Sequence, residues 1–152
     1  MKPFLIKGRF MILEKMTALV RKKNICVLST VSGNKPYCSL MAYITDGTCK
    51  EIYMVTHKNT TKFNNLQKNP LVSLLIDSRE TQPRSNAQAL TIDGVYTPLR
   101  DENKKQKLRD RMLKSFPHMQ NFIYHPEAEL ICIKINSFLL LEGLTESHFV
   151  SL

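Results

Sequence analysis

The stretch EIYMVTHKNTTKFNNLQKNPLVSLLID, which runs from Glu51 to Asp77, decides the fold prediction for this chain. Apolar residues at both ends of it predict two strands, 52–56 and 71–77. The polar segment between them predicts a turn and a short helix, which ends at Asn69-Pro70 because proline disfavours helical backbone at the preceding residue. A strand, a turn, a short helix and a second strand therefore form the middle of the chain.

The start of this helix predicts a binding site for an anion. Backbone N–H groups there have no partner within the helix and lie at the positive end of its dipole, and hydroxyl and ammonium groups add donors that suit a phosphate. The alternative is that Asn59 or Thr60 caps a surface helix while the lysines are solvated. The residues of this turn are Thr56, His57, Lys58, Asn59, Thr60, Thr61 and Lys62.

On the N-terminal side, the pattern predicts an amphipathic helix followed by a β-hairpin. Apolar residues recur every three or four positions between Arg9 and Lys23, which is the period of a helix. Strands at 25–31 and 37–44 follow, joined by a glycine-containing turn, and a second turn leads into strand 52–56. Because turns this short exclude a parallel crossover, the three strands are expected to be antiparallel.

On the C-terminal side, the polar residues 78–86 predict a loop, which is the expected mobile edge of any site. Residues 87–99 predict a strand with a bulge or a tight turn at Asp93-Gly94. The remaining expected elements are a charged helix at 101–116 with Leu108, Met112 and Phe116 facing inward, a shorter helical piece closed by His125-Pro126, strands at 130–135 and 138–144, and an edge strand at 148–152.

The predicted fold class is mainly β (α+β), in one domain that spans residues 1–152. Six or seven short strands separated by turn signals, with helices inserted at irregular intervals, indicate a closed antiparallel β-barrel with peripheral helices. A chain of 152 residues supplies one core and is too short for two independent ones.

The composition indicates a folded soluble protein with excess positive charge. The net charge is +9, and the chain contains no tryptophan. The basic clusters fall on predicted helices without an aromatic-rich basic strand, so attraction of phosphates is favoured over direct binding of nucleic acid. No apolar run is long enough to span a bilayer and the N-terminus lacks the apolar segment of a signal peptide, so a cytoplasmic location without a membrane partner is expected.

Residues with catalytic or metal-binding chemistry form no known pattern. The histidines are widely spaced, so no metal site is expected, and His57 alone lies in the candidate site. No serine has a Gly-x-Ser-x-Gly context, and apolar surroundings would raise the pKa of a cysteine thiol, so the catalytic residues stay unassigned. The cysteines are expected to be buried free thiols; they are Cys26, Cys38, Cys49 and Cys132.

The order of four short motifs resembles the FMN-binding split β-barrel of the pyridoxamine 5'-phosphate oxidase-like family. The resemblance covers about half the chain, from Ile25 to Leu99, and includes the last strands loosely. It implies a homodimer with two FMN sites at the subunit interface. The matching motifs are Asn34-Lys35-Pro36-Tyr37, Tyr53-Met54-Val55-Thr56, Thr60-Thr61-Lys62 and Asn69-Pro70-Leu71-Val72-Ser73-Leu74-Leu75.

The resemblance also implies which residues contact the flavin. The second strand of such proteins runs along the ring, where main-chain groups can bond to it whatever the side chains are. Gln88 matches a family glutamine near the flavin if the region of Asp93-Gly94 carries one extra residue, and otherwise Ala89 takes its place. The other implied contacts are Ser39, Leu40, Met41 and Ala42 at the ring, Val55 and Thr56 at its edge or the ribityl chain, and Lys58, Thr60, Thr61 and Lys62 at the phosphate.

Two departures from the family pattern bear on function. The Ser-Arg-Lys triplet that holds the phosphate in the family aligns with Thr60-Thr61-Lys62, so one bidentate arginine is lost, although Lys58 could restore charge. The C-terminal Arg, His and Trp of true pyridoxamine phosphate oxidases have no counterpart here. Oxidation of vitamin B6 is therefore not expected.

The resemblance thus implies an FMN-dependent oxidoreductase that acts on an unidentified small substrate. The flavin would do the chemistry and the protein would position it, with NADH or NADPH as the expected hydride donor. Three alternatives stay open: a flavin carrier or sensor without turnover, a haem-binding split barrel with His57 as axial ligand, and a basic nucleic-acid-binding module.

Overall fold

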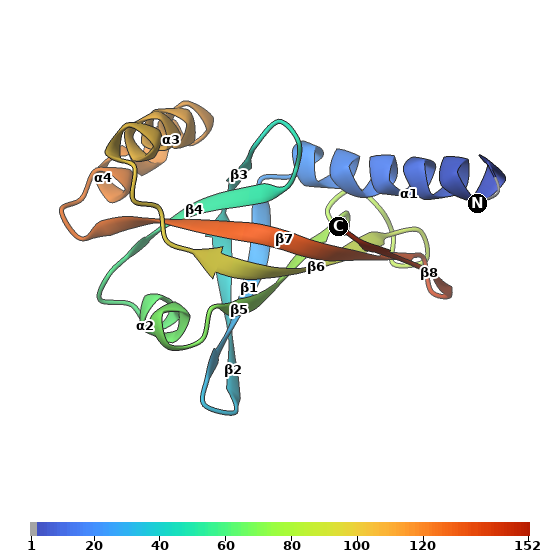
Figure 1. Ribbon diagram of the computed structural model, residues 1–152, viewed down its shortest axis with the longest axis horizontal. Coiled ribbons are helices and arrows are strands. Elements are labelled where there is room, and N and C mark those ends of the chain that lie inside the picture. The colour runs from blue at the N-terminus through green and yellow to red at the C-terminus, as the bar shows by residue number, and fades with distance from the viewer. Residues whose placement is uncertain (1–2) are drawn as a thin grey trace.

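The computed structural model describes residues 3–152, with side chains described from Leu5 onward, and shows one curled sheet with helices around it (Figure 1). The helices are α1 (Pro3–Lys22), α2 (Thr61–Lys68), α3 (Glu102–Ser115) and α4 (Gln120–Ile123), with a 3₁₀ turn at Pro117–Met119 before α4. The strands are β1 (Ile25–Ser32), β2 (Lys35–Ala42), β3 (Ile44–Thr45), β4 (Glu51–His57), β5 (Leu71–Asp77), β6 (Gln88–Thr97), β7 (Ala128–Glu142) and β8 (Glu146–Ser151).

The sheet is antiparallel in every strand pair and forms a split barrel. The hydrogen-bonded order is β2-β1-β5-β6-β7-β4-β3, with β8 beside β7. Only Tyr43 separates β2 from β3, so the two ends of this order belong to one bent segment of chain. The predicted antiparallel split barrel with peripheral helices is confirmed.

Alternate residues of the strands enclose the core of the barrel. β1 and β5 bury every second side chain, which is the pattern of a sheet with one face inside. Met16, Leu19 and Val20 of α1 are at most 5% exposed and close one end of the barrel. The hydroxyl of Tyr43 donates to the carbonyl oxygen of Val20 at 2.7 Å, so the bend between β2 and β3 is fixed to α1.

A second apolar cluster joins α3 to the outer face of β4 and β7. Leu108, Met112 and Phe116 are buried there against residues that include Tyr53 and Val55, as their spacing predicts. Because α3 covers one face of β4 and the barrel core covers the other, the five central residues of β4 are all buried.

The C-terminal strands differ from the prediction. One strand, β7, replaces the two expected at 130–135 and 138–144. Asp93 pairs with Ser137 and Gly94 with Ile135, so Asn136 is the unmatched residue of a bulge. The irregularity predicted at Asp93-Gly94 is therefore a bulge whose extra residue lies on the partner strand, and the strand continues through it.

Two N-terminal boundaries also move. α1 begins at Pro3 instead of Arg9, because proline is favoured at the first position of a helix. The expected strand 37–44 begins at Lys35 and is divided at Tyr43 into β2 and β3. Within residues 3–152, no helix combines the length and apolar character that crossing a bilayer requires.

Candidate functional site

The turn between β4 and α2 carries the predicted anion cradle, and its hydroxyl groups are already hydrogen-bonded. Thr60 caps α2: the N–H of Phe63 donates to its Oγ1 at 3.4 Å, and its hydroxyl donates to the carbonyl oxygen of His57 at 2.9 Å. The hydroxyl oxygens of Thr56 and Thr60 lie 3.1 Å apart, and Thr56 is buried. The capping role considered as the alternative is thus present, and it fixes the shape of the turn.

Positive charge at this turn comes from Lys58 and Lys62. The Nζ atom of Lys58 lies 3.8 Å from Oε2 of Glu129, which is close because β7 places Glu129 opposite Thr56. Lys62 is half-buried and takes part in no ion pair of the described residues, while Thr61 beside it is exposed. Glu129 also pairs with Lys105 at 3.3 Å, so it compensates Lys58 only in part. Positive charge therefore remains at Lys58 as well as at Lys62, which lies in the first turn of α2 at the positive end of the helix dipole.

Beside this turn, the barrel is split between β2 and β4. β3 pairs with β4 only through Ile44–Tyr53 and Thr45–Ile52. On the other side of Tyr43 the two strands have different partners: β2 pairs with β1, and β4 pairs with β7. Figure 1 shows β2 diverging from β4. Within residues 3–152, the facing edge of β2 has no strand partner, so its main-chain donors and acceptors are free to bind a planar heterocycle.

The residues predicted to contact the ring alternate between the two faces of β2. Met41 is buried in the barrel core, and Ser39 shares its inward face. Leu40 is 76% exposed on the outward face, which Ala42 shares. Side chains of one face only, together with the main chain, could therefore lie along a single ring.

The two predicted residues of β4 also point to opposite faces. Val55 is buried in the cluster under α3, whereas Thr56 is turned toward Thr60 and the start of α2. Thr56 therefore lies with the cradle, and Val55 supports the strand from its other face.

Gln88 lies apart from the other predicted residues within one chain. It is the first residue of β6, and β1 and β5 lie between β6 and β2 in the sheet. Its Nε2 donates to Oε2 of Glu142 at 3.4 Å. Within one chain, Gln88 is therefore separated from β2 by two strands, whereas the cradle follows directly on β4.

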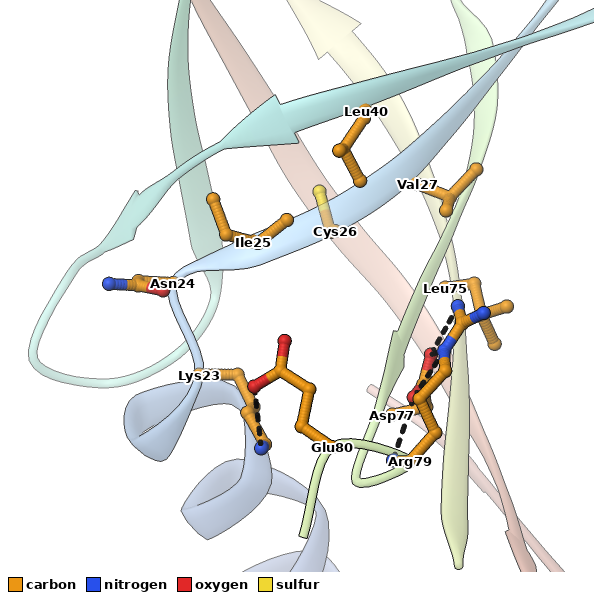
Figure 2. Close-up of a pocket in the computed structure, with 10 residues that line it drawn as sticks. All are labelled: Lys23, Asn24, Ile25, Cys26, Val27, Leu40, Leu75, Asp77, Arg79 and Glu80. Atoms are coloured by element: carbon orange, nitrogen blue, oxygen red, sulfur yellow. Dashed lines mark hydrogen bonds and ion pairs between the residues drawn. The ribbon is translucent and has the colours of Figure 1, made fainter. Parts of the chain in front are cut away.

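A cavity of about 260 Å³ opens on the outward face of β1, β2 and β5 (Figure 2). Figure 2 shows apolar side chains, Leu40 among them, on one side of it and two ion pairs on the other. Its lining residues are Lys23, Asn24, Ile25, Cys26, Val27, Leu40, Leu75, Asp77, Arg79 and Glu80. An apolar wall with a charged rim suits a ligand that is itself part apolar and part polar.

The rim of this cavity includes an ion pair that the sequence analysis missed. Arg79 donates from Nε and Nη2 to both carboxylate oxygens of Asp77, at 2.8 to 3.0 Å. These hydrogen bonds hold the pKa of Asp77 below its ordinary value. The available signal was an Asp-x-Arg spacing at the point where a strand enters a loop, which places both side chains at one edge of the sheet.

His57 belongs to a stacked group of rings on the side of the turn next to α4. Its ring lies 4.2 Å from the ring of Phe122 and 4.6 Å from that of His125, nearly parallel to both. Its Nε2 lies 3.2 Å from the carbonyl oxygen of Phe122. His57 is therefore already engaged by the segment around α4.

The cysteines are all free thiols, but one of them is not buried. Cys26, Cys49 and Cys132 are buried as predicted, and desolvation raises the pKa of Cys26 and of Cys132 to about 12. The prediction is wrong for Cys38, which is exposed because it shares the outward face of β2 with Leu40. The buried thiols are thus poor nucleophiles at neutral pH.

Comparison with known proteins agrees with this architecture. Residues 12–141 match the family model described as pyridoxamine 5'-phosphate oxidase. No curated protein matches the sequence.

Among solved structures, General Stress Protein 26 from Bacillus anthracis is 22% identical with a TM-score of 0.68, over 91% of this chain and 97% of that one. A FAD-binding protein from Mesorhizobium loti is 17% identical with a TM-score of 0.69, over 84% of this chain and 91% of that one. A haem-binding protein from Mycobacterium smegmatis is 16% identical with a TM-score of 0.75, over 90% of this chain and 57% of that one. These structures share the fold, and the family model matches most of the sequence. The chain therefore belongs to the pyridoxamine 5'-phosphate oxidase family.

Proposed function

We propose that this protein binds FMN and uses it as an oxidoreductase acting on a small substrate. The observation that carries the proposal is the split in the barrel, where the unpaired edge of β2 faces β4 and α2 begins beside it. Free main-chain groups suit the polar edge of a flavin ring, and a helix N-terminus with a lysine suits its phosphate. The family to which the chain belongs supports the same assignment.

Each predicted residue then has a distinct part. The N–H groups at the start of α2, with Thr61 and Lys62, would hold the phosphate, and Lys58 would add charge that Glu129, shared with Lys105, offsets only in part. Thr56 and Thr60 shape the turn through their hydrogen bonds. The main chain of 39–42 would follow the ring. When bound, the flavin supplies the transfer of hydride or electrons, and the chain positions it and limits its access to water.

A second copy of the chain would complete this site. Ile25 and Leu40 are 41% and 76% exposed on the outward face of the neighbouring strands β1 and β2, and exposed apolar patches mark interfaces. Within its own chain, Gln88 is separated from β2 by two strands, β1 and β5. In a two-fold dimer, Gln88 or Ala89 of one copy would serve the site of the other.

Two other functions would be distinguished by experiment: a flavin carrier or sensor, and a haem protein. A flavin carrier or sensor would bind FMN without rapid reduction by NADH or NADPH, which stopped-flow absorbance measures directly. A haem protein would need a free axial ligand, and the His57 ring is stacked and its Nε2 lies at hydrogen-bonding distance from a carbonyl oxygen. The cytoplasmic location expected from the sequence stays a prediction.

The phosphate assignment is tested by comparing FMN with riboflavin. Lys62→Ala removes a charge-assisted contact and should weaken the binding of FMN by about tenfold or more. The binding of riboflavin, which has no phosphate, should stay nearly unchanged. Lys68→Ala, at the other end of α2, is the matched control. Equal losses for both ligands, or an effect of Lys68→Ala as large, would mean that the phosphate lies elsewhere.

A further inference from the structure

The hairpin of β7 and β8 brings three metal-ligating side chains together, away from the flavin cradle. Glu142 and Glu146 are directly paired across the hairpin, and His148 is two residues beyond Glu146. Because side chains alternate along a strand, all three project from the same face. One ligand atom from each lies within 4.8 Å of the other two.

The surroundings of the cluster hold its central carboxylate in place. Lys15 of α1 donates to both oxygens of Glu142, at 3.1 and 3.0 Å, and Gln88 donates to Oε2 at 3.4 Å. The Nε2 atom of His148 lies 3.5 Å from Oε1. The side chain of Glu142 is 21% exposed, so it is anchored between α1 and the sheet with its charge largely screened from water.

The charges of the cluster are not balanced. Two carboxylates directly opposite each other on paired strands repel, which destabilises a hairpin unless a cation lies between them. Lys15 compensates Glu142, and the carboxylate of Glu146 makes no ion pair with any described residue. One negative charge is thus left beside an imidazole.

We propose that Glu142, Glu146 and His148 form a binding site for a divalent transition-metal ion. One imidazole nitrogen and two carboxylate oxygens suit Zn²⁺ or Mn²⁺ better than Mg²⁺, which prefers an all-oxygen shell. Three protein ligands leave coordination positions open to water or to a ligand. Lys15 is the competing cation: its ammonium group leaves Glu142 when the ion enters, and its flexible stem, 53% exposed, permits this.

The spacing Glu-x3-Glu-x-His is the sequence signal for this site, and it differs from the His and Cys patterns usually sought. It brings the ligands together only when the chain reverses between Glu142 and Glu146. None of the three ligands lies on β2, β4 or α2, but Gln88, which is assigned above to the flavin of a second copy, donates to Glu142.

The test is a titration of the full chain with Mn²⁺, with the free ion counted by electron paramagnetic resonance after removal of metals by a chelator. We expect one site per chain, from which Zn²⁺ displaces Mn²⁺ at lower concentration than Mg²⁺ does. Glu146→Gln and His148→Ala should each weaken Mn²⁺ by at least about tenfold. Lys15→Ala should strengthen Mn²⁺ binding, because it removes the competing ammonium group.

His118→Ala is the control, since His118 is exposed and distant from the hairpin in sequence. Glu146→Gln keeps the fold testable, because this side chain has no ion pair to lose. Absence of a saturable site, binding that Glu146→Gln and His148→Ala leave unchanged, or weaker binding in Lys15→Ala would each overturn the proposal.

Discussion

Gly143→Ala should loosen the loop between β5 and β6, because this glycine holds that loop against the turn between β7 and β8. Gly143 has a φ of +64°, and a Cβ there would lie 2.6 Å from the carbonyl oxygen of Ser85. Alanine in the left-handed region costs about 1 to 2 kcal/mol. Restoring ordinary contact at 3.4 Å also requires a displacement of about 0.8 Å, the difference between these two distances.

That displacement acts on two hydrogen bonds. The N–H of Gly143 donates to the carbonyl oxygen of Ala87 at 3.0 Å, and Nη1 of Arg84 donates to the carbonyl oxygen of Gly143 at 2.8 Å. Losing both adds about 1 kcal/mol each. The free energy of unfolding should therefore fall by about 3 to 4 kcal/mol, measured by urea denaturation with an unchanged m-value.

Gly33→Ala is the matched control for this substitution. Gly33 also has a positive φ, +57°, but nothing lies within 4 Å of a Cβ built there. The free energy of unfolding of Gly33→Ala should fall only by the cost of the left-handed backbone conformation, about 1 to 2 kcal/mol. Trypsin should also cut Gly143→Ala faster at Arg79 or Arg84 than it cuts the control. Equal stability losses in the two variants would refute the argument that the loop is held through Gly143.

Two further predictions concern stability. Asn65→Ala removes the buried amide that donates to the buried Oγ1 of Thr30 at 3.1 Å. The free energy of unfolding in urea should therefore fall by about 1 to 3 kcal/mol. Asn64→Ala, at an exposed position, should change it little. Hydrogen bonds from Lys15 hold the pKa of Glu142 below its ordinary value of 4.5. The stabilisation that these hydrogen bonds give the folded protein is therefore present above pH 4.5 and is lost as the pH falls through the lowered pKa. Lys15→Met should therefore be less stable than the wild type at pH 7, and thermal melts should show this difference shrinking below about pH 4.5; a constant difference would contradict this origin.

Local patterns predicted the middle of the barrel closely. β5 begins and ends at the predicted residues, and α2 stops before Asn69-Pro70 as expected, because proline and alternating apolar residues act within a few positions. The bulge at Gly94 was also predictable, since a glycine inside a strand pattern indicates close approach of another backbone. A Cβ at Gly94 would lie 2.7 Å from the carbonyl oxygen of Lys134.

Features that depend on pairing between distant residues were not predictable. The bulge residue is Asn136, on the partner strand, and the two strands expected at 130–135 and 138–144 run on through it as one strand. Lys58 was expected to serve a phosphate, but only the register of β4 with β7 reveals Glu129 next to it.

Side-chain contacts of the candidate site were likewise predictable only between residues close together in the sequence. His57 has ordinary turn surroundings in the sequence, and its stacking on Phe122 and His125 arises from a segment more than 60 residues later. The Asp77–Arg79 pair, by contrast, joins near neighbours and could have been found from spacing alone.

The central claim is that the split beside α2 binds FMN, and the most direct measurement is the visible spectrum of the purified protein with the mass of any cofactor released from it. The proposal predicts the absorption of an oxidised flavin and a released cofactor with the mass of FMN. A protein purified without cofactor should take up added FMN to one per chain. A colourless protein that fails to bind added FMN, or a spectrum dominated by the Soret band of haem, would contradict the claim.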